Sequence, residues 1–350
     1  MCRIKCMNRC VRFSRRNNWR ISPSRLRMSM AGTALLLRCG QFPAGISRQG
    51  RASLRNPPEG MPFVKLNGLL EPKMERTMEC YICTQCGTQY SESDEPPKNC
   101  TICTDERQFV NSHGQQWTTH AWLKRWNRNT VHAQGLGVIG IGIDPQVGIG
   151  QRALLVRGSD GYVLWDCVPL LDDGLAEFIT ALGGLRAIAV SHPHFHTSMV
   201  DWADVFNCSV YIHADNRRWV MRPDSRVQFW TGDTMELVPR MTLVRCGGHF
   251  PGSAVLYHNR DGGEIFTGDT FHVNPDHRTV GVMYGFPNYI PVSAATVMRV
   301  ARAVEPFEFR RVYGQWWDAV IPEDGKEVIR RSVERYAAAI DGKYDSLRAA

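Results

Sequence analysis

Acidic side chains are almost absent from the first 60 residues of this sequence. That segment contains 13 lysines and arginines but a single acid, Glu59, so its local charge is +12. The whole chain of 350 residues carries +8, and residues 61–350 therefore carry −4. Because the positive charge belongs to one end, the mildly acidic remainder gives no reason to expect a nucleic-acid partner.

The basic N-terminal segment allows two interpretations. Its composition, rich in arginine and serine, is typical of a mitochondrial transit peptide. Alternatively, it precedes the true start of the protein, for which Met61, Met74 and Met78 are available. In both cases we expect residues 1–77 to be a basic, disordered extension. The predicted compartment is the mitochondrion if the transit peptide is real and the cytoplasm if it is not.

Long apolar runs and a disulfide framework are also missing. The apolar patch from Met28 to Leu37 is too short to cross a bilayer, and we find no membrane-spanning segment elsewhere, so no membrane partner is expected. Cys167, Cys208 and Cys246 are isolated among apolar residues, which is typical of buried thiols. This cysteine usage favours a reducing compartment.

A glycine-rich stretch at residues 135–140 spells G-x-G-x-x-G, the pattern of dinucleotide-binding turns. That pattern requires a helix to follow it. Residues 141–145 read Ile-Gly-Ile-Asp-Pro instead, and this composition disfavours a helix. We therefore predict short strands and turns here and no nucleotide site.

Two C-x-x-C pairs follow the extension: Cys83 with Cys86, and Cys100 with Cys103. Two such pairs separated by a polar loop can close a tetrahedral four-thiolate site, and a small ribbon of this kind gains its folding energy from the metal. Disulfides or a single redox C-x-x-C are the alternatives, but neither explains the doubling. Cys80 is predicted to be a spare.

The cysteine segment is similar to generic zinc ribbons and to the rubredoxin-like module of rubrerythrins, which holds iron. We predict a four-cysteine metal ribbon over residues 78–110. Zn²⁺ is the expected ion, and iron remains possible. Residues 111–134 are polar and contain tryptophans, and we predict that they form a connector.

Three histidines alternate along the chain, His192, His194 and His196, between a predicted strand at residues 187–190 and a predicted helix from Met199. Imidazoles two residues apart on an extended turn can converge on one metal ion. By itself, the pattern also fits histidines that are hydrogen-bonded in the core or exposed at the surface.

Two later turns each offer one more ligand at the end of a predicted strand. His249 follows two glycines after the strand-like TLVRC, and Asp269 follows a glycine shortly after the strand-like GEIF. Together with the histidine turn, these residues resemble the metallo-β-lactamase fold superfamily. Its pattern is H-x-H-x-D-H after a strand, a His in a G-H turn, an Asp in a G-D turn and a final His.

The resemblance covers about residues 135–345 and implies an α/β fold, an αββα sandwich of two sheets with helices outside. The apolar pattern agrees with this fold. It predicts strands within residues 153–157, 161–168, 210–213, 254–258 and 280–285, a helix after Asp172, and two helices near the C-terminus.

Matched residue by residue, the resemblance implies a complete ligand set for one metal: His192, His194, His249 and Asp269. The ligands of a second metal are altered, because His196 stands where the family has Asp and Thr197 where it has His. The final His is absent from residues 311–317, the region where the family pattern places it. We therefore expect one Zn²⁺ at this site, with iron possible, and a second ion only if His196 recruits it.

The resemblance implies a metal-dependent hydrolase in which a mononuclear zinc carries hydroxide. Asp269 would bind the metal or orient the water, and His196 is the nearby side chain placed to act as general base. The expected partner is a small-molecule ester, thioester, lactam or phosphodiester. Two alternatives stay open: an iron-dependent oxidoreductase of flavodiiron type, although those proteins have Glu where this chain has His194, and a non-catalytic metal-binding relic of the fold.

Three other polar residues complete the predictions. Asp166 lies in the predicted strand 161–168, where the resembled fold has an Asp that supports the site; a plain strand-end Asp is the alternative. His272 and His277 are predicted to be surface-loop residues, because the Asn-Pro-Asp between them marks a turn.

Overall fold

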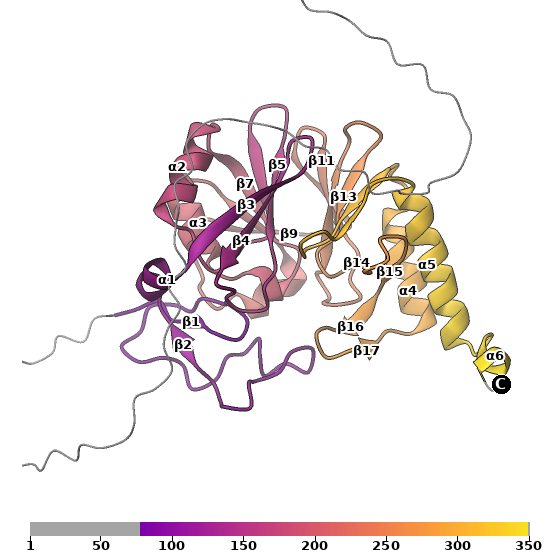
Figure 1. The fold of residues 1–350 in the computed structure, drawn as a ribbon, viewed down its shortest axis with the longest axis horizontal. Helices are drawn as coiled ribbons and strands as arrows, with labels where there is room; N and C mark the ends of the chain where they lie inside the picture. Colours follow the sequence, from indigo (N-terminus) through magenta and orange to yellow (C-terminus); the bar gives the residue numbers. More distant parts are fainter. Residues whose placement is uncertain (1–77, 349–350) are drawn as a thin grey trace, which may run out of the picture. The chain divides into compact units, whose positions relative to one another are not determined.

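A computed structural model describes residues 78–348 of the chain (Figure 1). The predicted extension, residues 1–77, lies outside the described residues. Among the described helices, none is both long and apolar enough to cross a membrane.

Seven strands form the first sheet. In spatial order they are β3 (Arg128–Gly135), β4 (Val138–Asp144), β5 (Ala153–Arg157), β6 (Tyr162–Trp165), β7 (Leu185–Ala189), β8 (Val210–His213) and β9 (Val227–Trp230). Neighbouring strands are antiparallel from β3 to β6 and parallel from β6 to β9. Helices α2 (Asp173–Ala181) and α3 (Met199–Phe206) cover its outer face (Figure 1).

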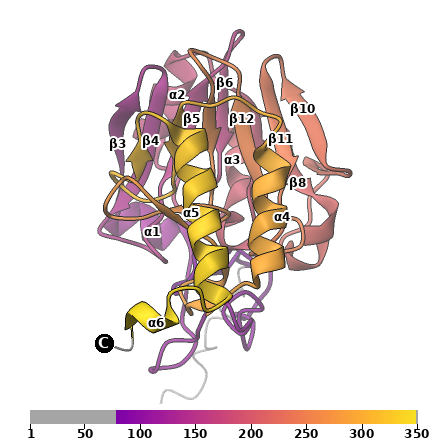
Figure 2. The same cartoon turned by 90° about the vertical axis from the view of Figure 1, so that its right-hand side faces the viewer.

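Six strands form the second sheet. Their spatial order is β10 (Thr234–Val238), β11 (Met241–Arg245), β12 (Ala254–His258), β13 (Glu264–Phe266), β18 (Arg311–Tyr313) and β19 (Val320–Ile321). The pair β13 and β18 is parallel, and the other pairs are antiparallel. Helices α4 (Ala294–Val304) and α5 (Gly325–Ile340) lie side by side over its outer face (Figure 2), and α6 (Asp345–Arg348) follows.

The core between the two sheets explains why β5 reads as a continuous apolar run. Leu154 and Val156 face the second sheet, where they pack with Leu256 and Phe266. Leu155, which points to the other face of β5, packs with the residues beneath α2 and α3. A strand buried on both faces carries no polar alternation. The layers are thus helix, sheet, sheet, helix, which confirms the predicted αββα sandwich.

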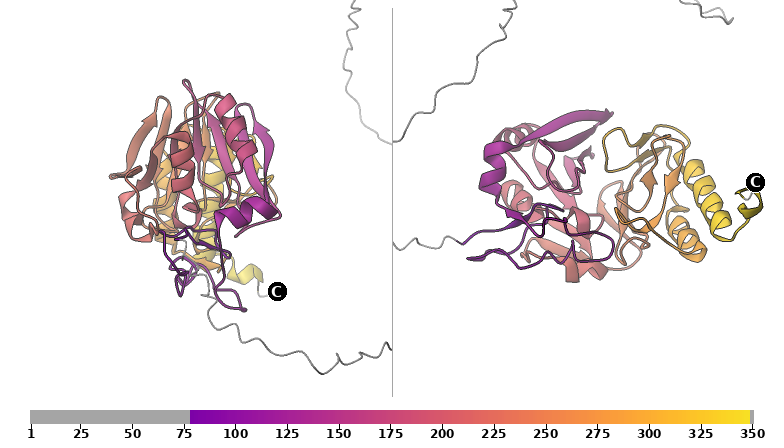
Figure 3. Two further views of the ribbon diagram at one scale, coloured as in Figure 1. Left: turned by 90° about the vertical axis from the view of Figure 1, so that its left-hand side faces the viewer. Right: turned by 60° about the horizontal axis from the view of Figure 1, so that its bottom comes forward.

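The four-cysteine segment lies against one end of this sandwich (Figure 3). Its strand β1 (Ile82–Cys83) pairs with β2 (Trp117–Thr118), and α1 (His120–Trp126) leads from there into β3. The first sheet therefore begins at Arg128, inside the stretch predicted to be a connector, because β3 pairs with β4 along its whole length.

Two local predictions are resolved by strand pairing. The glycine-rich stretch contains the end of β3, the turn of the hairpin and the start of β4, which agrees with the predicted short strands and turns. The prediction of one continuous strand at residues 280–285 is wrong. It is divided into β15 (Val280–Gly281), which pairs with β14 (His272–Val273), and β16 (Met283–Gly285), which pairs with β17 (Ile290–Pro291).

Candidate functional site

The histidine turn begins where β7 ends. His192 has an extended backbone, Pro193 then starts a short 3-10 turn, η1 (Pro193–Phe195), and α3 follows after Ser198. The proline fixes the first position of that turn, which makes the backbone reverse immediately after His192. As a result His192 and His194 point to one place although they belong to different conformations of the chain.

Four side chains converge at this place: His192, His194, His249 and Asp269. The Oδ2 atom of Asp269 lies 3.1 Å from His192 Nε2, 3.7 Å from His249 Nε2 and 3.8 Å from His194 Nδ1. His249 Nε2 lies 3.4 Å from His194 Nδ1. A tetrahedral zinc with bonds of about 2.0–2.1 Å needs ligand atoms about 3.3–3.4 Å apart. The cluster has this size.

Part of this donor set has no hydrogen-bond partner in the described part of the chain. His192 Nε2 and both carboxylate oxygens of Asp269 are buried without a hydrogen-bond partner. Burial of unsatisfied polar atoms is costly, and a bound cation would satisfy all of them. Burial also lowers the pKa of His194 to about 4 and that of His249 well below its usual value, so both rings are neutral at pH 7. Neutral imidazole is the form that binds metal.

A chain of hydrogen bonds fixes the tautomer of His192. The backbone N–H and the hydroxyl of Ser191 both donate to Asp166, at 2.7 and 3.1 Å. The Ser191 oxygen can then accept from His192 Nδ1, which is 2.8 Å away. This arrangement leaves the lone pair of Nε2 for the cluster. Asp166 is completely buried and holds Ser191, as expected for a residue that supports the site. It is not an exposed aspartate at the end of an edge strand.

His249 is oriented in the same way by the backbone. Its Nδ1 donates to the carbonyl of Tyr284, 2.8 Å away, and its Nε2 faces the cluster. Neither Ser191 nor Tyr284 was among the predicted site residues. The sequence gives a weak indication for Ser191, because it is a polar residue directly before the first histidine. It gives none for Tyr284, whose contribution is a backbone carbonyl.

His196 is not part of the four-residue cluster. It is buried beside it, with Nδ1 donating to the carbonyl of Trp219 at 3.1 Å and Nε2 without a partner among the described residues. Burial lowers the pKa of His196 to about 3, so its Nε2 is an unprotonated acceptor at neutral pH. Its predicted role as general base stays a prediction.

The two later histidines behave differently from each other. His277 is exposed in a turn, as predicted. His272 is not a surface-loop residue: it starts β14, and its ring lies 4.7 Å from the ring of Phe286 and 5.2 Å from that of Trp316. Aromatic packing from sequence-distant segments, which no local pattern records, explains why that prediction was wrong.

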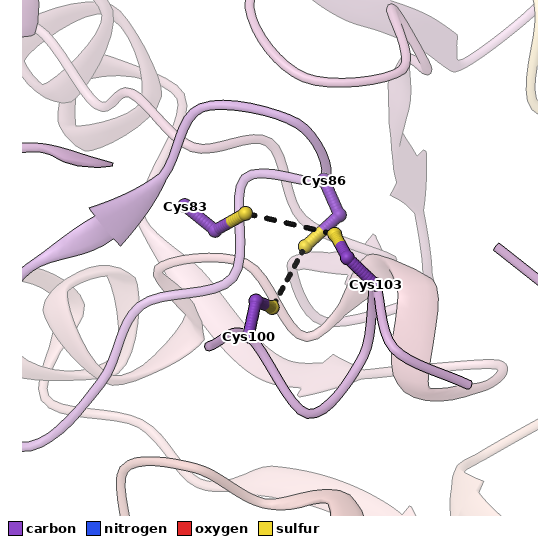
Figure 4. Close-up of side chains that lie close together, drawn as sticks. All are labelled: Cys83, Cys86, Cys100 and Cys103. Atoms are coloured by element: carbon purple, nitrogen blue, oxygen red, sulfur yellow. Dashed lines mark hydrogen bonds between the residues drawn. The ribbon is translucent and has the colours of Figure 1, made fainter. Parts of the chain in front are cut away.

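The second cluster consists of the four cysteines, whose sulfur atoms turn toward one another (Figure 4). The Sγ atoms of Cys83 and Cys103 are 3.6 Å apart, as are those of Cys86 and Cys100. A disulfide bond would require about 2.05 Å. Four thiolates around a tetrahedral zinc, with bonds of about 2.3 Å, would lie about 3.8 Å apart. The spacing therefore matches a metal site, and Cys80 lies outside it.

The comparisons with known proteins agree with this geometry. Residues 148–316 match the family described as the metallo-beta-lactamase superfamily. The uncharacterized protein YmaE of Bacillus subtilis (strain 168) is 38% identical over 271 residues, which cover 76% of this chain and 98% of that protein. The chain belongs to the metallo-beta-lactamase superfamily.

Solved structures of metallo-beta-lactamases show a more distant likeness. FIM-1 from Pseudomonas aeruginosa, in its mono-zinc form, is 16% identical with a TM-score of 0.46, covering 60% of this chain and 96% of that one. A metallo-beta-lactamase from Hirschia baltica is 17% identical with a TM-score of 0.43, covering 59% and 96%. Similarities of this size transfer no activity to the present chain.

In this metallo-beta-lactamase superfamily member, one layer of side chains separates the two clusters. Phe250 packs with the four cysteines and Trp219 on one side. On the other side its ring lies 5.1 Å from His194 and 4.9 Å from His249. Arg107, from the cysteine segment, stacks on Phe250 and donates from Nε to the His249 carbonyl at 2.7 Å. The cysteine segment thus helps to hold the turn that carries a candidate ligand.

Proposed function

We propose that this protein is a metal-dependent hydrolase with a mononuclear site. The residues that would hold the metal are His192, His194, His249 and Asp269. The observation that carries the proposal is the convergence of three buried imidazoles and a buried carboxylate at the spacing of zinc ligands, with no hydrogen-bond partner for His192 Nε2 and the two Asp269 oxygens among the described residues. Three imidazoles and one carboxylate form a donor set that suits Zn²⁺ and would also accept iron.

A divalent cation held by these residues would supply a water of lowered pKa and would polarise a carbonyl oxygen of the substrate. The chain's own residues prepare the site for it. Asp166 and Ser191 hold His192 with its Nε2 lone pair free, and the Tyr284 carbonyl does the same for His249. Asp269 contributes the negative charge that offsets part of the charge of the cation.

Proton movement is assigned to His196. Its Nδ1 proton is held by the Trp219 carbonyl, so Nε2 is the atom that can accept a proton from water or return one to a leaving group. What supports this role is the absence of a partner for Nε2 within the described residues.

The cysteine cluster is proposed to hold a second zinc with a structural role. All four cysteines are buried, and their sulfurs are at the separation that a tetrahedral thiolate site requires. A closed site with four protein ligands leaves no position for a substrate.

Paired histidine variants test the proposal. We expect His249→Ala to lose both the metal of the histidine cluster and turnover on a panel of esters, thioesters, lactams and phosphodiesters. His196→Ala should keep the metal and lose at least about a hundredfold in turnover, the usual contribution of general acid–base catalysis. His113→Ala, an exposed histidine outside both clusters, is the matched control and should change neither. A His196→Ala protein without the metal would show that the base assignment is wrong.

A second candidate function is metal binding without turnover. It is favoured by the burial of the ligand side chains, of which Asp269 and His192 are only 2% and 1% exposed. Full metal content with no turnover on any substrate of the panel would select this function over the hydrolase.

A further inference from the structure

A cavity of about 450 Å³ lies at the same edge of the sandwich as the histidine cluster. Three segments line it: the loop 145–152 between β4 and β5, residues 272–287 after β13, and the loop 314–319 after β18. Because β18 runs parallel to β13, the loops that follow these two strands leave the sheet at one edge. Asp269 lies in one of these loops, so the cavity and the candidate ligand share this edge.

Ring contacts connect the cavity to the candidate ligands. Trp316, which lines the cavity, has its ring centre 6.2 Å from that of Phe195, and Phe195 lies 4.3 Å from the His192 ring. A second connection runs along the chain. His272, another lining residue, is three positions after Asp269. The cavity wall is therefore built from segments that also position the cluster.

The chemistry of the wall is aromatic and uncharged. Its aromatic members are Phe286, Trp316 and Trp317. Lysine, arginine, aspartate and glutamate are absent from the described residues that line it, and its polar members are His272, Asn274 and His277. Burial lowers the pKa of His272, so this ring is neutral at pH 7.

We propose that this cavity binds an uncharged aromatic group of the substrate, so that the reacting bond lies toward the histidine cluster. Pockets for small ligands commonly have volumes of about 300–1,000 Å³, and aromatic rings gain both burial and edge-to-face contacts in such walls. A phosphodiester would find no cationic side chain here. The substrate class is thereby narrowed to esters, thioesters or lactams that carry an aromatic group. This inference rests on the proposed hydrolase function.

The first test measures binding without turnover. The full chain, loaded with zinc, is titrated calorimetrically with 2-naphthol, a neutral aromatic probe. We expect saturable binding that weakens about tenfold in Phe286→Ala, since the variant removes one aromatic wall. Phe178→Ala removes the same atoms from an exposed position on α2 and should bind like the parent protein. Equal binding by both variants would overturn the proposal.

The second test measures turnover of two thioesters of one thiol, with acetyl and phenylacetyl groups. We expect kcat/KM to favour the phenylacetyl compound by at least about tenfold and Phe286→Ala to remove that preference. Hydrolysis of both compounds at equal rates, without binding of 2-naphthol, would overturn the cavity assignment and leave the hydrolase standing. Binding of 2-naphthol with no hydrolysis of either compound, or of any substrate of the panel, would support the cavity as a binding site and overturn the proposed hydrolase.

Discussion

The cysteine cluster and the histidine cluster are assembled in opposite ways. The four cysteines come from residues 83–103, a segment with a single two-residue strand, β1. The members of the histidine cluster are spread over residues 192 to 269, and each lies in a loop after a strand of the sandwich. The sandwich has hydrophobic cores that do not involve the cluster. A short segment with little apolar burial depends on its metal for folding, whereas a sandwich can form its site before metal arrives. The comparison predicts that the two sites respond differently to the loss of their ligands.

The largest effect is expected from removing thiolate ligands. Cys83→Ser together with Cys100→Ser should release the metal of the ribbon and unfold residues 78–110, because structural zinc contributes about 10–16 kcal/mol to folding in small domains of this kind. The measurement is amide hydrogen exchange of this segment beside that of the sandwich strands.

Cys80→Ser is the control for this double variant, since Cys80 lies outside the cluster. It should leave exchange unchanged. Protection of residues 78–110 that persists in the double variant would contradict the dependence of the ribbon on metal.

A smaller effect is expected where the cysteine segment and the sandwich touch. Asp201 on α3 accepts a hydrogen bond from Gln89 at 2.8 Å and pairs with His120 and Arg222. Although burial opposes ionisation, these partners lower the pKa of Asp201 to about 2. The carboxylate thus contributes about 2 kcal/mol that is present above pH 4 and lost as the pH falls toward 2.

Asp201→Asn should remove this contribution at pH 7, so that the stabilities of the variant and the parent converge near pH 2. The readout is the free energy of unfolding against pH. Asp204→Asn, on the exposed side of the same helix, is the matched control. A difference from the parent protein that does not change with pH would contradict the electrostatic explanation.

A similar or smaller effect is expected from disturbing the orientation of the His192 ring. Ser191→Ala removes the oxygen that accepts from His192 Nδ1, and we expect zinc affinity in the histidine cluster to fall about tenfold or somewhat more. Competition with a chromophoric chelator measures the affinity. Ser159→Ala, at a hairpin tip, is the control, and unchanged affinity in Ser191→Ala would show that Asp166 and Ser191 are structural only.

The smallest effect is expected at Arg107. Arg107→Gln removes the hydrogen bond to the His249 carbonyl and the stacking on Phe250. Zinc affinity of the histidine cluster should fall a few-fold, by about 1 kcal/mol, because the ligand itself is retained. Arg125→Gln, on the exposed side of α1, is the control. An unchanged affinity would mean that the ribbon does not act on the histidine site.

Much of the fold was predictable because its strands and helices carry local patterns. The apolar run of β5 and the aspartate cap of α2 were readable directly, and the cap is present: the Asp172 side chain accepts from Leu175 N. The histidine turn, the G-H turn and the G-D turn were also local, so the members of the cluster could be named before their distances were known.

The features that the sequence did not reveal depend on contacts between distant segments. β3 looked like a connector because its exposed, polar residues show little apolar alternation, and its pairing with β4 is what makes it a strand. The sequence around His272 indicates a surface loop, but in the structure Phe286 and Trp316 pack against its ring. The support of His249 by the Tyr284 carbonyl comes from the backbone, which carries no sequence code.

The most direct test of the central claim is metal content by plasma mass spectrometry, on the parent chain and on a variant with Cys83, Cys86, Cys100 and Cys103 all changed to Ser. The account predicts two metal ions per parent chain and one in the variant, held by the preformed histidine cluster. A variant that binds no metal would contradict the claim that the sandwich forms its site on its own.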